Sequence, residues 1–381
     1  MQLTFPAFGD EEIEYLRRCL ASGWVTQGPY VDEFEKSFAE RHASRHALAT
    51  TSCTAALHLA AAALELGPGD EVIVPAFTWV TSAHCARYMG AEVRFVDIDP
   101  RTFNLDPAKL LDAISERTRA VVVVHLFGLA ADMEPILKIT QPRGIAVIED
   151  AACAIGTSYR GRPVGTLGDL GCFSFHPRKV VTTGEGGMVS TGDDELARRV
   201  RALRNHGATG PEPEEVEPHG PWTMARFEVL GFNLRMSDIQ AAVGVAQLQR
   251  LDGLLAERHA AALRYHELLA SLPDLESPIE GTDGAGHTYQ SYVIRLTEGG
   301  RLRRNRIMAH LAERSIQTRP GTHAVHCLGY YRERYGLSAE DFPFARDAED
   351  TTITLPLFPG IGESDQQQVV EALHTALSRV N

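Results

Sequence analysis

The sequence predicts an α/β protein with a large domain on a mostly parallel, seven-stranded sheet flanked by helices, and a smaller C-terminal α+β domain. Short apolar runs alternate with segments of helical spacing at intervals of about 25 residues, which is the βαβ pattern of a doubly wound sheet. Most of these runs are apolar on both faces, as expected of strands covered by helices on both sides. The chain has 381 residues, which is enough for two domains.

Seven strands and four helices make up most of the expected large domain. The apolar runs of strand length cover residues 46–49, 71–75, 93–96, 120–125, 145–149, 171–175 and 187–190. The spacing of apolar residues predicts helices over residues 54–66, 80–89, 107–113 and 132–139. Such sheets bind ligands at the carboxyl ends of their strands, so the residues that follow each run are the first candidates for function.

A loop and a long helix follow the last of these strands. Residues 210–222 are rich in Pro, Gly and Glu, and we expect an exposed and mobile loop there. The pattern over residues 237–272 predicts one long helix, with Ser237 as its N-cap and with Gly244 and Gly253 as weak points.

The predicted C-terminal domain begins on that helix. Proline and glycine residues interrupt the chain after it. A second α+β unit follows, with strands over residues 290–296 and 351–356 and helices over residues 302–313 and from Ser364 onward. We place the domain boundary near residue 250, so that the large domain spans residues 1–250 and the small domain residues 251–381.

Composition and charge exclude several classes of protein. With 37 basic and 50 acidic residues, the net charge of −13 provides no basic surface for nucleic acid or anionic membranes. The six cysteines form no C-x-x-C pair, which is typical of reduced thiols in a cytosolic protein. The first residues lack the basic and apolar regions of a signal peptide. We therefore expect a cytoplasmic protein with no nucleic-acid or membrane partner, and we predict no metal site.

Two chemical groups follow predicted strands. Glu149 and Asp150 end an apolar run, and a carboxylate there needs a cationic partner to stay ionised; a helix N-cap is the alternative.

Lys179 is one of only four lysines against 33 arginines (37 − 4). It precedes a turn with Gly184 and Gly187, where an amine suits a Schiff base with a carbonyl. A surface lysine beside a hairpin is the alternative, and the glycines indicate a tight turn or close backbone approach.

A third motif, Thr51-Ser52-Cys53-Thr54, lies between a strand and an alanine-rich helix. Backbone N–H groups and hydroxyls at a helix N-terminus can hold a phosphate, with a simple Ser/Thr cap as the alternative. The order of the three motifs is more specific than any one of them. A phosphate site, an Asp about a hundred residues later and a Lys about thirty residues beyond suit pyridoxal 5′-phosphate, which needs an anion site, a partner for its ring nitrogen and an amine.

The chain resembles the DegT/DnrJ/EryC1/StrS family of sugar aminotransferases over essentially its whole length. Six ordered blocks carry the resemblance: SGWVTQGPYVDEFE (22–35), TSCTAALHLA (51–60), GDEVIVPAFTWVTSA (69–83), IEDAACAIG (148–156), FSFHPRKVVTTGEGGMV (173–189) and GFNLRMSDIQAAVGVAQL (231–248). The resemblance implies the type I fold of pyridoxal-phosphate-dependent transferases and a transaminase activity.

The resemblance also implies roles for single residues. Lys179 matches the lysine that holds the cofactor as an aldimine and moves the substrate proton, Asp150 the partner of the ring nitrogen, and Trp79 the aromatic that stacks on the ring. The other matching cofactor contacts are Ser52, Cys53, Thr54, Ala55, Cys153, Ser174, His176 and Asn233. Cys53 stands where many relatives have glycine, and Cys153 where they have Gln or His. Asn233 would reach the phosphate of the neighbouring subunit, which implies a homodimer with composite active sites.

Transamination in two half-reactions follows from the resemblance. An amino-acid donor, L-glutamate by family habit, converts the cofactor to pyridoxamine phosphate, and the amine then passes to a keto group of a nucleotide-linked deoxysugar. A ketocyclitol acceptor is a close variant, and a regulatory protein that binds the cofactor without turnover is the non-catalytic alternative. Dehydratase relatives carry histidine at the position of Lys179, and a cysteine desulfurase would need an exposed cysteine, for which Cys327 is the candidate.

Two segments are candidates for substrate recognition. In residues 318–331, phosphate or sugar hydroxyls are possible ligands of Arg319, His323 and His326, with a role in holding the small domain as the alternative. Near the N-terminus, the residues expected to face the sugar or the partner subunit are Trp24, Thr26 and Gln27.

Overall fold

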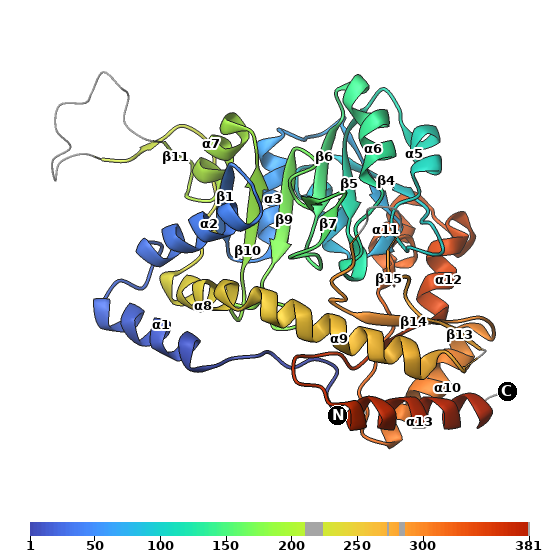
Figure 1. The fold of residues 1–381 in the computed structure, drawn as a ribbon. Coiled ribbons are helices and arrows are strands. Elements are labelled where there is room, and N and C mark those ends of the chain that lie inside the picture. Colours follow the sequence, from blue (N-terminus) through green and yellow to red (C-terminus); the bar gives the residue numbers. More distant parts are fainter. Residues whose placement is uncertain (210–223, 273, 282–285, 380–381) are drawn as a thin grey trace.

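The computed structural model describes residues 1–209, 224–272, 274–281 and 286–379. The predicted loop over residues 210–222 lies outside the described residues. Figure 1 shows a large sheet with helices on both of its faces and a C-terminal unit, in orange and red, packed beside it.

The large sheet contains all seven predicted strands, with ends displaced by at most two residues. In spatial order they are β1 (His46–Thr50), β10 (Gly187–Thr191), β9 (Leu170–Ser174), β6 (Ala146–Asp150), β5 (Thr118–Val124), β2 (Glu71–Pro75) and β4 (Glu92–Val96). Within this sheet, β10 runs antiparallel to both of its neighbours and the other pairs are parallel. The predicted, mostly parallel, seven-stranded sheet is therefore confirmed.

Two apolar cores lie on the two faces of this sheet. In β5, Val122 and Val124 belong to one core and Val121 and Val123 to the other, because neighbours along a strand point to opposite faces. The helices on the first face are α3 (Cys53–Ala63), α4 (Thr81–Tyr88) and α7 (Asp194–Leu203). Those on the second face are α2 (Pro29–Arg41), α5 (Pro107–Ala113), α6 (Met133–Thr140) and α8 (Asp238–Gln249). Helix α1 (Asp10–Ser22) contacts α8, and both α1 and α2 are additional to the predicted elements.

The C-terminal unit has a third apolar core. Its antiparallel sheet has the order β13 (Leu275–Glu276), β14 (Tyr292–Leu296) and β16 (Thr352–Leu355). The helices that form this core are α9 (Leu251–Leu269), α10 (Gly300–Glu313) and α13 (Glu363–Arg379). Helices α11 (Gly329–Tyr335) and α12 (Pro343–Thr351) also belong to this unit, but their buried residues join the first core of the large sheet. The predicted strands and helices of this unit are present, whereas β13, α11 and α12 are additional.

The predicted long helix over residues 237–272 is two helices. Ser237 caps α8 as predicted, since its Oγ accepts the N–H of Gln240 over 3.3 Å. The interruption falls at Arg250, between α8 and α9, and not at the predicted weak points Gly244 and Gly253. Gly244 serves close packing instead, because a Cβ there would lie 2.7 Å from the ring of Phe34 in α2.

The first residues of the chain pack against the C-terminal unit. Gln317 N–H donates to the Met1 carbonyl over 3.0 Å, and Leu357 N–H donates to the Leu3 carbonyl over 3.1 Å. Figure 1 shows the N-terminus beside α13 accordingly. A domain boundary near residue 250 stays our proposal, with the first few residues attached to the smaller unit.

Short two-stranded ladders complete the fold. They pair β3 (Phe77–Thr78) with β15 (His323–Ala324), β7 (Ser158–Tyr159) with β8 (Arg162–Pro163), and β11 (Ala208–Thr209) with β12 (Arg226–Phe227). In the described ranges, no helix combines the length and the apolar composition needed to span a bilayer.

Candidate active site

A cavity of about 330 Å³ lies at the carboxyl ends of the parallel strands. Val124, Asp150 and Ser174, which end three neighbouring strands, all contribute to its wall. Most of the predicted cofactor residues line it: Ser52, Cys53, Thr54, Trp79, Asp150, Cys153, Ser174, His176 and Lys179. The remaining two, Ala55 and Asn233, are not part of this wall.

Asp150 places a buried carboxylate against the cavity. Ser82 Oγ donates to its Oδ2 over 2.7 Å and Ala152 N–H donates to its Oδ1 over 3.2 Å. Burial raises the pKa of Asp150, although these bonds and the charge of Lys179 act in the opposite direction. No helix begins after Asp150, so the N-cap alternative is wrong. A cation in the cavity would stabilise the ionised carboxylate.

The neighbouring Glu149 points to the other face of the sheet and is fully bonded. Its oxygens accept N–H groups of Gly165, Leu167 and Gly168 over 2.7–2.8 Å and Nε2 of His125 over 2.9 Å. Nδ1 of His125 accepts a backbone N–H, so the imidazole proton lies on Nε2. Burial by itself would raise the pKa of Glu149, but the bonds from His125 and the backbone outweigh it and lower the pKa.

Lys179 lies on a turn that follows β9. The carbonyl of His176 accepts the Lys179 N–H over 2.8 Å, and Nδ1 of His176 accepts the Arg178 N–H over 3.2 Å, so His176 fixes the turn. The lysine side chain enters the cavity, where Nζ lies 3.0 Å from Sγ of Cys153. The alternative of a surface lysine beside a hairpin is therefore wrong.

Residues 52–54 begin helix α3 at the cavity wall. Ser52 Oγ accepts the N–H of Ala55 over 3.1 Å, so Ser52 caps the helix and the Ala55 amide is already bonded. The first turn of α3 offers N–H groups and the positive end of the helix dipole to an anion. Gly187 packs against this turn, and a Cβ there would lie 2.4 Å from the carbonyl carbon of Ser52. This close approach explains one glycine of the predicted turn.

Trp79 lines the cavity just after β3 and has contact with the C-terminal unit. Strand β15 pairs with β3 and brings His323 opposite Thr78. The ring centroids of Trp79 and His323 are 5.6 Å apart. One residue of the predicted substrate segment therefore touches the predicted stacking residue, although His323 does not itself line the cavity.

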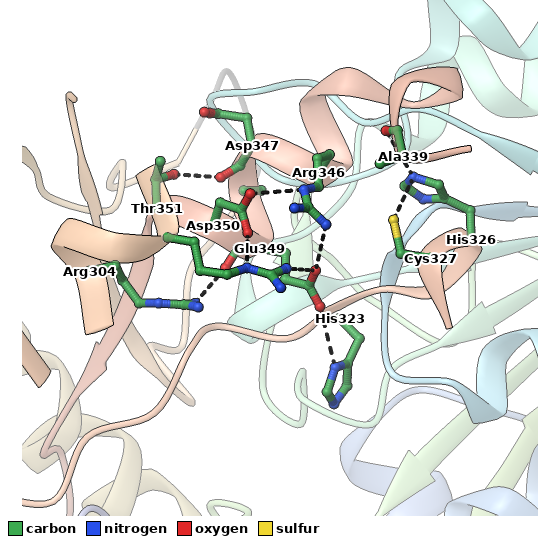
Figure 2. Close-up of polar contacts among 12 residues, drawn as sticks. Arg304, His323, His326, Cys327, Ala339, Arg346, Asp347, Glu349, Asp350 and Thr351 are labelled. Carbon is green, nitrogen blue, oxygen red and sulfur yellow. Dashed lines mark hydrogen bonds and ion pairs between the residues drawn. The ribbon is translucent and has the colours of Figure 1, made fainter. Parts of the chain in front are cut away.

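A charged network of the C-terminal unit stands behind His323, and Figure 2 shows part of it. Oε1 of Glu349, on α12, lies 3.6 Å from Nδ1 of His323, and the other oxygen accepts Nη2 of Arg301 over 2.9 Å. Arg346 lies 3.9 Å from Glu349. Burial would raise the pKa of Glu349, but the bond from His323 and the charge of Arg301 lower it overall.

His326 and Cys327 do not line the cavity. Nε2 of the fully buried His326 contacts the carbonyl of Ala339 over 3.3 Å and Sγ of Cys327 over 3.2 Å (Figure 2). These contacts favour the alternative that His326 holds the small-domain segment. Burial raises the pKa of Cys327, which opposes the thiolate that a cysteine desulfurase needs.

The N-terminal candidates also lie outside the cavity of their own chain. The carbonyl of Thr26 accepts the N–H of Asp238 over 3.0 Å, and the carbonyl of Gln27 accepts Nε1 of Trp24 over 3.0 Å. The side chain of Trp24 is 54% exposed. Of the two predicted roles, contact with a partner subunit fits this placement better than contact with a sugar in this cavity.

Several polar residues of the wall were not among the predicted ones. They are Thr78, Thr81, Arg178, Glu185, Gln290 and Thr322. Gln290 comes from the C-terminal unit, and its Nε2 donates to the carbonyl of Arg178 over 2.8 Å. Gln290 is a polar residue at the start of a predicted apolar strand, and this pattern could have marked it as a candidate. The sequence places the charged residue Glu185 in the glycine turn, but it does not show that the residue lines the cavity.

These groups fit pyridoxal phosphate. The cavity is bordered by the amine of Lys179, by the buried carboxylate of Asp150, which makes no ion pair in the described part of the chain, by the first turn of α3 and by the ring of Trp79. An aldehyde, a basic ring nitrogen and a phosphate need such a set. Fold and site together define a pyridoxal-phosphate-dependent enzyme of the type I transferase fold.

Comparisons with known proteins give the same class. Residues 6–374 match the model of the DegT/DnrJ/EryC1/StrS aminotransferase family. The spore coat polysaccharide biosynthesis protein SpsC of Bacillus subtilis is 40% identical over 372 residues (97% of this chain, 95% of SpsC), and the GDP-perosamine synthase of Caulobacter vibrioides is 40% identical over 378 residues (99% and 98%). A putative sugar aminotransferase, Spr1654 from Streptococcus pneumoniae, solved in its PMP form, has a TM-score of 0.95 at 28% identity and full coverage of both chains.

The chain belongs to the DegT/DnrJ/EryC1/StrS aminotransferase family. The predicted type I fold and the predicted class, a pyridoxal-phosphate-dependent transaminase, are confirmed.

Proposed function

We propose that this protein moves an amino group from L-glutamate to a keto group of a nucleotide-linked sugar and so makes an amino sugar. The observation that carries the proposal is one cavity that unites Lys179, Asp150 and the first turn of α3. The relatives support the acceptor class, since one of them is a GDP-perosamine synthase that matches 99% of this chain. We place the activity in the cytoplasm.

In this proposal, each wall of the cavity has one task. Lys179 would hold the cofactor covalently through Nζ, and its free amine would carry the proton to and from the substrate carbon. Asp150 bonds the protonated ring nitrogen, and Trp79 covers the ring. Cys53 and Thr54 at the start of α3, with Ser174, receive the phosphate. The cofactor supplies the electron sink that makes the substrate carbon acidic.

The short contact between Lys179 and Cys153 has a place in this scheme. With Nζ 3.0 Å from Sγ, the thiol accepts a hydrogen bond from the amine and holds it inside the cavity. A thiol is a weak hydrogen-bond partner, so it can release the amine when the cofactor binds. We assign Cys153 to positioning Nζ and not to chemistry of its own.

We further propose a homodimer with composite active sites. Asn233 is exposed and lies outside the cavity of its own chain, as expected of a residue that serves the neighbouring subunit. Large apolar side chains are exposed on α1, on α8 and on the segments near them: Ile13, Leu20, Trp24, Val25, Leu230 and Ile239. Exposed apolar side chains in such number favour a protein partner, and a second copy is the partner that would complete the site.

The visible absorption spectrum of the purified protein tests the proposal. We expect the yellow band of a lysine-bound cofactor, which L-glutamate bleaches and which returns when a keto acceptor is added. Nucleotide-linked keto sugars and ketocyclitols should be compared as acceptors, and only the former should restore the band efficiently. A band that L-glutamate leaves unchanged contradicts the donor, and no band after addition of pyridoxal phosphate contradicts the whole proposal.

A further inference from the structure

The thiol of Cys153 differs from the other cysteine thiols in what its sulfur contacts. Its side chain lines the cavity, and Nζ of Lys179 donates a hydrogen bond to Sγ over 3.0 Å. In the described ranges of the chain, the other hydrogen-bonded cysteine sulfurs contact backbone carbonyls or an imidazole: Cys19, Cys85 and Cys327. A thiol and an amine therefore meet at hydrogen-bond distance in one cavity.

Two cations face the thiol of Cys153. The amine of Lys179 is its direct neighbour, and Arg319, which lines the same wall, acts on it electrostatically. Asp150 of this wall opposes the two cations, but two hydrogen bonds already engage its carboxylate. A thiol that faces cations reacts more readily as a nucleophile, since the thiolate is the reactive form.

Access also favours Cys153 over the other thiols. Cys153 and Cys327 are half-buried, whereas the other four cysteines are buried. Burial raises the pKa of Cys327, which lies outside the cavity, and it raises the pKa of Cys53, the second thiol of the cavity wall. A cavity of about 330 Å³ has room for a molecule as small as hydrogen peroxide beside Sγ of Cys153.

We propose that a peroxide closes a reversible sulfenamide bond between Sγ of Cys153 and Nζ of Lys179. The sulfur attacks one peroxide oxygen, the O–O bond breaks, and the leaving oxygen takes a proton from Nζ and departs as water. The lone pair of Nζ then attacks the sulfenic acid, the S–O bond breaks, and a second water leaves with another Nζ proton. The sulfur loses two electrons, and the peroxide is reduced to the two waters.

The contact on the page favours this bond over further oxidation of the sulfur. Nζ is already the neighbour of Sγ, and the flexible stem of a lysine lets it close the remaining distance. An adjacent nucleophile traps a sulfenic acid before a second peroxide reaches it. A small thiol reverses the bond, because its attack on Sγ releases the amine and leaves a mixed disulfide that a second thiol reduces.

The bond is a switch for the enzyme. It occupies the nitrogen to which the proposed function attaches pyridoxal phosphate; this consequence rests on the proposed function, whereas the bond itself does not. Peroxide therefore turns the cofactor-free protein off, and thiols turn it on again. The cofactor, once attached to Lys179, protects the pair.

Non-reducing mass spectrometry of the full chain tests the bond. The cofactor-free protein and the holoenzyme are each treated with an equimolar amount of hydrogen peroxide and digested. In the cofactor-free protein, we expect the peptides with Cys153 and Lys179 to be joined, with a loss of about 2 Da, and to separate in dithiothreitol. In the holoenzyme we expect no joined peptides. Binding of pyridoxal phosphate, followed by absorption, should be lost after peroxide and restored by dithiothreitol.

Three cysteine variants are the controls. Cys153→Ala lacks the sulfur, so peroxide should join no peptides and should leave its binding of pyridoxal phosphate unchanged. Cys327→Ala removes the other half-buried thiol and should form the bond as the wild-type protein does. Cys53→Ala removes the second thiol of the cavity wall and should also form the bond.

Three results would overturn the proposal. A gain of oxygen on Cys153 without joined peptides shows a simple sulfenic or sulfinic acid. Joined peptides that disappear in Cys53→Ala show a disulfide between the two cavity thiols. A joined protein that takes up pyridoxal phosphate as before shows that the bond is no switch. Failure of the proposed function is seen separately, because the untreated protein would then transfer no amino group while peroxide still joined the peptides.

Discussion

Glu149 and Asp150 are neighbours at the end of one strand, yet the two faces of the sheet treat them in opposite ways. Glu149 accepts hydrogen bonds from three backbone N–H groups and from His125. Asp150 accepts two, from Ser82 and Ala152, and borders the cavity. The pKa of Glu149 is lowered and that of Asp150 is raised, although both are buried.

The difference separates a carboxylate that serves the fold from one that serves a ligand. Bonds within the chain compensate for the burial of Glu149, so its charge stabilises the protein. The burial of Asp150 is compensated only in part, so its charge costs stability until a cation arrives. Active sites often keep such a cost, because a site that binds a charged group must leave capacity for it.

Lys179→Ala gives the largest expected effect and tests the face of the sheet that carries the cavity. We expect turnover to fall by a factor of about a thousand or more, because the amine is both the attachment point and the proton carrier. The fold should survive, since in the described part of the chain the thiol of Cys153 is the hydrogen-bond partner of Nζ. Absorption spectra and steady-state rates measure the loss. Lys36→Ala, at an exposed lysine of α2, is the control, and retained activity in Lys179→Ala would contradict the role of this lysine.

Asp150→Asn should lower kcat/KM by about a hundredfold, because the ring nitrogen loses an ionic partner. In the cofactor-free protein, the same change should raise the free energy of unfolding by about 1 kcal/mol near neutral pH. The hydroxyl of Ser82 can turn to accept from the new amide and donate to Thr78, 2.9 Å away. Kinetics and thermal melts of the cofactor-free protein check both parts. A rate within about threefold of the wild-type rate would contradict the role of Asp150.

Glu149→Gln is the matched change one residue away, and it should lower stability strongly and the catalytic rate only weakly. The new amide would face donors that cannot turn, because they are backbone N–H groups and the Nε2 proton of His125. We expect a loss of about 3 kcal/mol in the free energy of unfolding, measured by urea denaturation, with a smaller effect on the rate per folded molecule. A stable variant with a low rate would break the comparison.

The pH dependence of stability separates the two carboxylates further. The folded pKa of Glu149 is lowered, so its stabilisation is present above the unfolded pKa and is lost as the pH falls through the folded value. The folded pKa of Asp150 is raised, so its cost is present above the folded pKa and disappears below the unfolded one. Toward acid pH, therefore, Glu149→Gln should approach the wild-type stability from below and Asp150→Asn from above, in melts of the cofactor-free protein.

The sequence predicted the strands and the groups that end them, because hydrophobic runs and rare residue types are local signals. Lys179 and Asp150 could be found in this way. Ser82 could not, since a serine on a helix is common and its bond to Asp150 depends on how α4 packs on the sheet. Gln290 likewise reaches the cavity only through the docking of the C-terminal unit.

Arg319 and His326 show the same limit from the other side. Both were candidates for substrate contact in the segment over residues 318–331, and the sequence offers no means of choosing between them. The structure turns Arg319 into the cavity and His326 into the contact with Ala339. Tertiary packing decides where each side chain points, and this orientation separates a binding residue from a structural one here.

Replacement of Glu349 should have the smallest effect on the site, because this carboxylate combines features of Glu149 and of Asp150. Its bonds to Arg301 and Arg346 resemble those of a structural carboxylate, but it also reaches Trp79 through His323. In Glu349→Gln we expect the affinity for pyridoxal phosphate to fall about twofold to fivefold, as the loss of one partly exposed ion pair allows. Titration of the cofactor-free protein, followed by absorption, measures this affinity.

A double-mutant cycle with His323→Ala decides whether Glu349 acts on the cofactor through His323. If it does, Glu349→Gln has no further effect on cofactor affinity once His323 is replaced, because the carboxylate then has no contact that leads to Trp79. If the two losses add in full, Glu349 acts through the fold of the C-terminal unit as a whole. It would then belong with Glu149, and the ladder between β3 and β15 would hold the two units together without tuning the site.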